Sequence, residues 1–166
     1  MIIDYQIKTN GECYSITQTK DNEISYSEKN NNTICFYDIF ERKIKATISN
    51  ISKCNNCLES LIMINKDLLL IPGNNQISII NINEYKLIRK IDVPNANIIT
   101  GVCLLNKNML LTGDYSKMIR QWKIDGDNLI LISKKEKTHD KGINVLLNMG
   151  NGLIASGSND STIKIW

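Results

Sequence analysis

The sequence predicts an all-β protein built from four repeated units. Two observations support this prediction. Four short segments of the same shape recur along the 166 residues, and their last residues are separated by 43, 42 and 44 positions. Each segment follows a polar turn and lies among apolar runs of strand length, while no helix-period pattern of useful length competes. A regular period of this size indicates a repeat architecture.

The recurring segments contain the β-branched and aromatic residues that favour strands. They are TICFY (33–37), QISII (76–80), MIRQW (118–122) and TIKIW (162–166). Each comes after a second strand and a turn rich in Gly, Asn, Asp or Ser, residues that favour tight reversals. These runs are ISYSEKNNN (24–32), LLLIPGNN (68–75), MLLTGDYSK (109–117) and LIASGSNDS (153–161). Every unit therefore contains a predicted β-hairpin.

Two further strands complete the predicted unit. Upstream of the hairpins lie the apolar runs CYSIT (13–17), LESLIMI (58–64), ITGVCLL (99–105) and INVLLNM (143–149). Downstream of the first three lie the charged or Lys-ended runs ERKIKATI (41–48), EYKLIRKI (84–91) and NLILISKK (128–135). We expect the apolar strands to be buried between neighbouring sheets. The charged fourth strand is expected at the outer edge, where charge prevents edge-to-edge pairing.

The unit boundaries follow from this order. We expect one domain over residues 1–166, with units at approximately 10–48, 49–92, 93–137 and 138–166. Residues 1–9, MIIDYQIKT, resemble one more outer strand.

Composition excludes several classes of protein. With 20 basic and 17 acidic side chains and only three Arg, the net charge of +3 is too even for a dedicated nucleic-acid binder. No apolar run approaches the ~20 residues that span a bilayer, and the first residues do not form a secretory signal. The five Cys are scattered. We therefore expect an intracellular, cytoplasmic protein with reduced thiols.

The last unit resembles the WD40-repeat β-propeller family. Its segment ASGSNDSTIKIW follows the family's strand–turn–strand pattern ending in Trp, and His139 lies 27 residues before Trp166, where the family has its Gly-His histidine. The resemblance implies a propeller of four-stranded antiparallel blades, about four of them in this chain. It also implies a structural tetrad of His139, Ser156, Asp160 and Trp166, in which Asp accepts from His, His contacts the Ser hydroxyl, and Ser accepts from the indole N–H.

The other units keep less of the family pattern. The third has Thr112 and Trp122, with Ser116 at the Asp position and no His. The first has Ser27, Asn31 and Tyr37 in these places, and the second has Leu70, Asn74 and Ile80. The Trp-Asp dipeptide that names the family is absent from the sequence.

The resemblance implies a non-enzymatic protein–protein interaction scaffold within an intracellular complex, with other proteins as partners and neither nucleic acid nor a membrane span. The family's usual partner face places Asn30, Tyr115 and Asn159 in exposed turns as candidate partner-binding residues, with the connections 52–58, 94–97 and 137–141 beside them. A phospho-motif or phosphoinositide-binding propeller module is the alternative. Such recognition favours clustered Arg.

Two patterns suggest chemistry and have simpler structural explanations. Cys54 and Cys57 have metal-ligand spacing, but a structural zinc site needs four ligands. His139, Ser156 and Asp160 have the residue types of a hydrolase triad, but a triad is recognised by geometry, and the tetrad accounts for all three. We therefore expect no catalytic, cofactor-binding or metal-binding residues, no cofactor and no enzymatic activity.

The blade number raises the question of completeness. Sixteen predicted strands would allow residues 1–9 to complete the last unit and close a four-bladed ring. The family, however, points to rings of about seven blades. We therefore expect the segment to belong to a longer propeller, or to complete a ring with another chain, because an open arc would expose apolar end faces.

Overall fold

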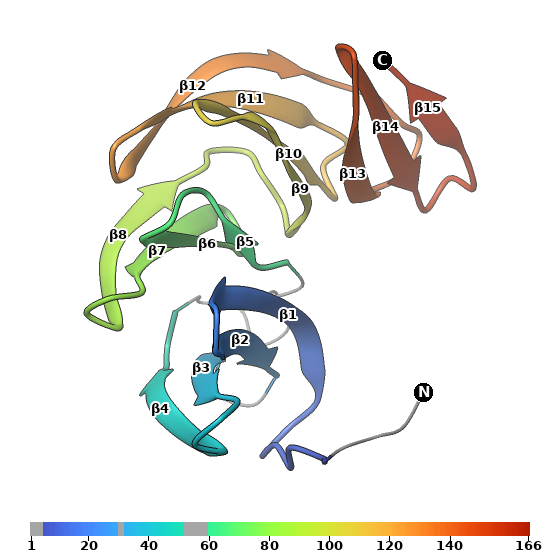
Figure 1. Ribbon diagram of the computed structural model, residues 1–166. Coiled ribbons are helices and arrows are strands. Elements are labelled where there is room, and N and C mark those ends of the chain that lie inside the picture. Colours follow the sequence, from blue (N-terminus) through green and yellow to red (C-terminus); the bar gives the residue numbers. More distant parts are fainter. Residues whose placement is uncertain (1–4, 30–31, 52–59) are drawn as a thin grey trace.

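The computed structural model describes residues 5–29, 32–51 and 60–166. Within these residues the chain forms four antiparallel sheets and no helix. Figure 1 shows the sheets arranged as successive blades of an arc, with the first strand of each blade innermost. The all-β class and the propeller arrangement predicted from the sequence are confirmed.

Each blade is a meander in which consecutive strands are hydrogen-bonded neighbours. Blade 1 contains β1 (Cys13–Lys20), β2 (Glu23–Glu28), β3 (Thr33–Asp38) and β4 (Lys43–Ile48). Blade 2 contains β5 (Ile62–Met63), β6 (Leu68–Pro72), β7 (Gln76–Asn81) and β8 (Lys86–Asp92). Blade 3 contains β9 (Ile99–Asn106), β10 (Met109–Asp114), β11 (Ile119–Asp125) and β12 (Asn128–Lys135), and blade 4 contains β13 (Ile143–Gly150), β14 (Leu153–Ser158) and β15 (Ile163–Ile165).

The core lies between blades, in three junctions. At the blade 1–2 junction, Ile34 and Phe36 pack against Leu69, Ile71 and Ile80. At the blade 2–3 junction, residues such as Leu70, Ile77 and Ile79 of blade 2 meet Leu110 and Trp122 of blade 3. At the blade 3–4 junction, Cys103 and Leu111 pack against Ile143, Leu146 and Ile154. The alternation of the strands explains this, because successive side chains point to opposite faces and so to opposite neighbours.

Burial follows the predicted order across a blade. All residues of β3 are buried, whereas β4 is exposed or half-buried, and most of β12 is exposed. The Lys-rich strands therefore form the outer rim, as the charge pattern predicts.

The N-terminal segment differs from the expectation of an outer strand. The described part of it, residues 5–9, belongs to no strand, and blade 4 has three strands rather than four. Tyr5 and Ile7 pack against Tyr26, Cys35 and Tyr37 of blade 1. This packing places residues 5–9 on blade 1.

Candidate partner-binding face

The four predicted tetrad residues lie together in blade 4. The Trp166 indole N–H donates to Ser156 Oγ at 2.8 Å, and Ser156 Oγ lies 2.7 Å from His139 Nε2. His139 Nδ1 lies 2.9 Å from Asp160 Oδ2. Every polar group is paired when Ser156 donates to Nε2 and Nδ1–H donates to Asp160. This chain of hydrogen bonds links the loop before β13 to the hairpin of β14 and β15 and to Trp166, which follows β15.

Asp160 is the anchor of the turn between β14 and β15. Its carboxylate accepts from the Thr162 hydroxyl at 2.6 Å, the Thr162 N–H at 3.0 Å and the Asp140 N–H at 2.9 Å. The Thr162 hydroxyl, followed by the Asp140 N–H and the His139 ring, lowers the pKa of this carboxyl far below its usual value, although burial opposes the shift. The ionised Asp160 thus holds the hairpin turn against the connection that precedes the blade.

The Asp160–His139–Ser156 chain has the order of a hydrolase triad, but its surroundings do not suit catalysis. Ser156 is 0% exposed and also accepts from Trp166, and His139 is buried. A nucleophile must reach its substrate, so this hydroxyl has no access to one. The arrangement is the polar core of a blade.

Blade 3 replaces the tetrad with a buried ion pair that the sequence analysis missed. Trp122 Nε1–H donates to Thr112 Oγ1 at 2.9 Å, as the retained residues suggest. The sequence comparison places Ser116 at the tetrad's Asp position, but the carboxylate in this blade is Asp114, which forms an ion pair with Arg120. Both side chains are almost fully buried. Alternation along β11 could have indicated this pair, because Arg120 points to the same face as Trp122.

Arg120 and Lys164 occupy the same position in their blades, two residues before Trp122 and Trp166. The Arg120 guanidinium is 3.5 Å from the Pro94 carbonyl oxygen, and Lys164 Nζ donates to the Thr138 carbonyl at 2.7 Å. In blades 3 and 4 a cation from the third strand therefore binds the connection that enters the blade.

The structure corrects the predicted register of blades 1 and 2. In the register of blades 3 and 4, the hydroxyl residues Thr112 and Ser156 lie opposite Arg120 and Lys164 on the neighbouring third strand. The residue at the equivalent position is Tyr26, opposite Cys35, in blade 1 and Ile71, opposite Ser78, in blade 2. The predicted residues Ser27 and Leu70 are each one position away. The turn is one residue longer in blade 1 and one shorter in blade 2, and a shift of one residue moves a side chain to the opposite face.

Main-chain hydrogen bonds join the blade-to-blade connections to the turns between second and third strands. Within a blade, the turn binds the entering connection: Lys29 N–H to Glu12 O, Tyr115 N–H to Ile98 O and Asn159 N–H to Gly142 O, at 3.0–3.1 Å. The same turns bind the next connection, since Ile51 N–H donates to Asn32 O, Val93 N–H to Asn75 O and Thr138 N–H to Lys117 O. We call these turns and connections, as far as the structure describes them, the connection face.

Two of the three predicted partner-binding residues lie on the connection face. Asn159 is exposed, and its Oδ1 accepts from Asn144 Nδ2 at 2.7 Å. Tyr115 is half-buried, and a Cβ added at Gly142 would lie 2.7 Å from its Cδ1, so the ring packs on the connection entering blade 4. Asn30 lies outside the described residues, as does the whole of the connection 52–58 with Cys54 and Cys57.

A second polar cluster lies at the opposite ends of blades 1 and 2. The buried carboxylate of Glu23 accepts from the Thr19 hydroxyl at 2.8 Å and from the Tyr85 hydroxyl. Lys45 lies 3.8 Å from Glu23, and Lys20 Nζ donates to the Ile82 carbonyl at 2.9 Å. Burial, followed by the contact with the Glu23 carboxylate, raises the pKa of Tyr85. The cluster fastens blade 1 to blade 2 and was not foreseen from the sequence.

The three arginines are separated in the structure. Arg42 lies over the Tyr5 ring, Arg89 pairs with Asp127 at 2.9 Å on the outer rim, and Arg120 is buried. Among the described residues no three His, Cys, Asp or Glu side chains gather as metal ligands. Within the same part of the chain, no helix is long and apolar enough to cross a membrane.

Comparisons with known proteins agree on the fold. No protein-family model matches the sequence, and neither does any curated protein. Among solved structures, the chain is similar to the WD40 β-propeller domain of Doa1, with 17% identity, a TM-score of 0.76 and coverage of 95% of this chain and 51% of that one. It is similar to U3-55K at 10% identity and a TM-score of 0.78, covering 96% of this chain and 50% of that one. The RRP9 WD40 repeats match at 11% identity and a TM-score of 0.79, with 96% and 49% covered.

This chain spans about half the length of each of these structures. The predicted resemblance to WD40 β-propellers is therefore confirmed at the level of the fold. The chain folds as four consecutive blades of a WD40-type β-propeller.

Proposed function

We propose that this chain is a non-enzymatic protein–protein interaction module, which acts in a cytoplasmic complex and binds its partner through the connection face. The observation that carries the proposal is the main-chain bonding of this face. A loop already held by its neighbours loses little conformational entropy on binding, so more of the contact energy appears as affinity. Rigid scaffolds that present loops are also where binding residues are usually found.

The exposed side chains of blades 3 and 4 give this surface its chemistry. Asn97, Lys137, Asp140, Lys141 and Asn159 are exposed in the connections and the turn that form this face in blades 3 and 4, and Tyr115 is half-buried there. Polar side chains of both charges around a partly buried aromatic residue are typical of interface rims and anchors. The alternative, recognition of phosphorylated motifs or phosphoinositides, gains no support from the arginines, which do not converge on one surface.

Quantitative affinity capture tests the proposal with charge-matched variants. Lys141→Glu changes the connection face, and Lys86→Glu makes the same change on the outer strand of blade 2, where Lys86 is also exposed. We expect Lys141→Glu to reduce recovery of the partner at least ~10-fold, with Lys86→Glu close to the unmodified protein. Equal recovery with both variants, or loss only with Lys86→Glu, would show that the partner binds elsewhere.

Tyr115→Phe and Asn159→Ala refine the test. Tyr115→Phe keeps the packing on Gly142 and removes only the hydroxyl, so a loss of partner with this variant assigns the hydroxyl to the interface. Asn159→Ala removes an exposed amide. Circular dichroism of each variant separates a lost contact from a lost fold.

A further inference from the structure

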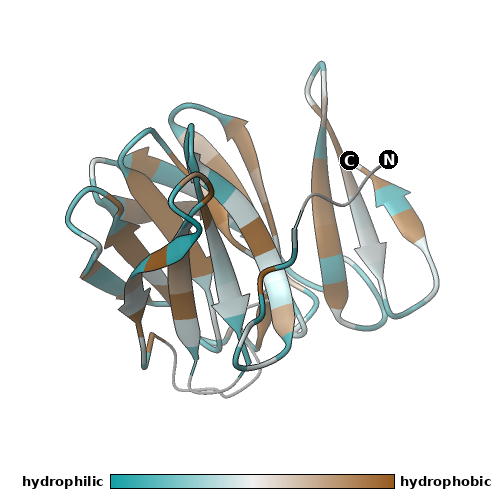
Figure 2. Ribbon diagram, turned by 60° about the horizontal axis from the view of Figure 1, so that its bottom comes forward, coloured by the Kyte–Doolittle hydropathy of each residue, from teal (hydrophilic) through white to brown (hydrophobic). Residues whose placement is uncertain are grey.

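The outer strand of blade 3 carries an exposed apolar run. Ile130, Leu131 and Ile132 follow one another on β12 and are 44%, 46% and 52% exposed. Figure 2 shows the hydrophilic residues mainly in the turns and the hydrophobic residues along the strands, whose side chains fill the blade junctions. A single apolar residue on a surface is ordinary, but three exposed in succession indicate a functional surface.

The strand register identifies the equivalent residues of the other outer strands. Ile130 and Leu131 pair with residues of β11, and Ile132 lies at the bulge that follows. The same places are occupied by Lys43, Ile44 and Lys45 in β4 and by Lys86, Leu87 and Ile88 in β8. Lysines at an open sheet edge hinder pairing with another strand. β12 has no charge at these three places and so lacks this protection.

β12 is also an open strand edge. It pairs with β11 and, within the part of the chain that the structure describes, with no other strand. Figure 1 shows it as the outermost strand of blade 3. With eight residues it is longer than β4 and β8, which have six and seven. The N–H and C=O groups that point outward from such an edge are available to a further strand.

The exposure of β12 arises beside complete blades. Leu131 pairs with Trp122, which packs into the core between blades 2 and 3. Paired residues share a face of the sheet, so Leu131 points towards blade 2, which has four strands. Ile130 points the other way, and its counterparts Lys43 and Lys86 are exposed beside blades that also have four strands. The open run is therefore a property of blade 3 and its surroundings on the rim.

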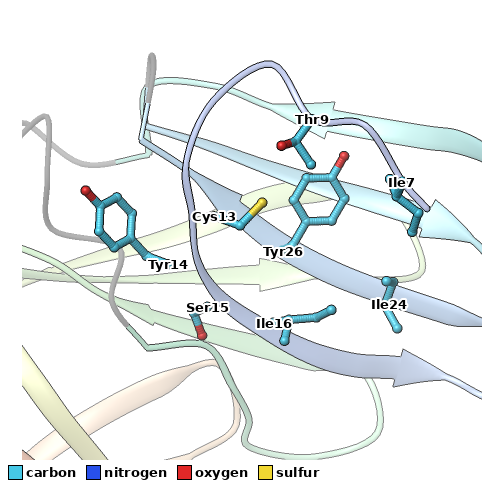
Figure 3. A pocket seen from close by; sticks show the side chains of 8 residues that line it. All are labelled: Ile7, Thr9, Cys13, Tyr14, Ser15, Ile16, Ile24 and Tyr26. Carbon is cyan, nitrogen blue, oxygen red and sulfur yellow. The ribbon is translucent and has the colours of Figure 1, made fainter. Parts of the chain in front are cut away.

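The apolar outer face of blade 1, by contrast, already has a cover. Tyr5 and Ile7 of the N-terminal segment pack against Tyr26 and Tyr37, which are 3% and 7% exposed. Figure 3 shows Ile7, Thr9 and Tyr26 around a hollow of about 330 Å³ on this face. The chain itself therefore occupies most of this surface, whereas β12 is open.

Basic side chains flank the apolar run. Lys123 of β11 lies opposite its first residue, and Lys134 and Lys135 follow its end; all three are exposed. Glu136 binds Lys134 at 2.7 Å, but both side chains are about half exposed, so this ion pair contributes little. Lys135 also contacts the Trp166 ring. An incoming strand with acidic residues at its ends would complement the charge of this edge.

We propose that β12 is a docking edge for an extended segment of a partner protein, which adds to blade 3 as a fifth strand. The segment has apolar side chains opposite residues 130–132 and Asp or Glu near its ends. Main-chain hydrogen bonds supply affinity, and the side chains supply specificity. A second copy of β12 is a poorer occupant, because it brings basic residues beside its apolar run. The edge lies on the rim, so the proposal is independent of the connection face.

Fluorescence polarisation with labelled synthetic peptides tests the proposal on the purified chain. The first probe has the length of β12, alternating Val and Thr in its middle, and Glu at both ends. A second probe has Lys in place of Glu, and a third has two adjacent central Pro residues, which remove N–H groups from both edges. We expect saturable binding of the first probe and at least ~10-fold weaker binding of the other two.

A double variant tests the apolar run itself. Ile130→Thr/Ile132→Thr keeps the β-branching that favours a strand and removes apolar surface, without changing the charge. We expect it to weaken binding of the first probe at least ~10-fold, because less apolar surface is buried. Ile44→Thr is the matched control, since Ile44 is 45% exposed on the outer strand of blade 1, and it should bind as the unmodified chain does. Circular dichroism verifies that each variant is folded.

Hydrogen exchange locates the added strand. The bound probe should slow amide exchange in β12 and leave β4 and β8 unchanged. No binding of the first probe, equal binding of the Pro-containing probe, or slowing in the turns of the connection face alone would overturn the proposal. Sedimentation of the unmodified chain as an oligomer that the double variant dissociates would also overturn it, because a second copy would then occupy the edge.

Discussion

Removing the Ser156 hydroxyl should destabilise the chain more than removing any exposed hydroxyl. Ser156 Oγ joins Trp166 Nε1, at 2.8 Å, to His139 Nε2, at 2.7 Å. Ser156→Ala breaks both hydrogen bonds and leaves a ring nitrogen on each side without its partner. A lost hydrogen bond costs about 1 kcal/mol, and an unsatisfied buried group costs about 1–3 kcal/mol. Trp166 is half-buried, so water satisfies part of its loss, and we expect about 2–3 kcal/mol.

For a chain of this length, each kcal/mol lowers Tm by about 2–4 °C. Ser156→Ala should therefore lower Tm by about 4–12 °C in a calorimetric or circular dichroism melt. Ser133→Ala is the matched control, because its hydroxyl bonds Gln121 at 3.1 Å on the exposed rim, and it should change stability by less than about 0.5 kcal/mol. Both must be measured at one protein concentration, since association shifts Tm. Equal shifts for the two variants would refute the argument that the tetrad supports blade 4.

Three further predictions concern acid stability, cysteine reactivity and the blade 1–2 junction. The pKa of Asp160 in the folded protein lies below its ordinary value of 3.8, so the ionised carboxylate stabilises the fold above that pH, and this stabilisation is lost as the pH falls further. Asp160→Asn should therefore flatten the acid limb of a stability–pH curve, and an unchanged limb would contradict this. Burial raises the pKa of Cys103 to about 11, so iodoacetamide at pH 8 should label the exposed Cys13 well before Cys103, as measured by peptide mass spectrometry; equal rates would mean that the blade 3–4 junction opens readily. Tyr85→Phe removes a donor from the buried Glu23 and should cost about 1–2 kcal/mol in denaturant unfolding, whereas Tyr14→Phe, whose hydroxyl bonds the exposed Glu12 at 2.9 Å, should cost much less.

The sequence by itself determines the strand order and the repeat. The predicted runs at 33–37, 76–80 and 128–135 fall within β3, β7 and β12, because alternation and charge report directly which strands are buried and which face water. The residues of the last tetrad are also visible in the sequence, since its spacing is intact. A local sequence pattern is sufficient to predict a strand and its burial wherever the neighbouring residues along the chain decide the environment of each side chain.

Only the tertiary structure decides the register of the divergent blades and the placement of the ends. Turns that differ by one residue put Tyr26 and Ile71 at positions that uniform spacing assigns to Ser27 and Leu70. The Glu23–Tyr85 contact joins side chains of two different blades, 62 residues apart in the sequence, and no local pattern encodes it. Residues 5–9 have strand-like composition, yet Tyr5 and Ile7 pack on blade 1. In each case the side chain's environment depends on which surface of a neighbouring blade lies beside it, and only the tertiary structure brings that surface there.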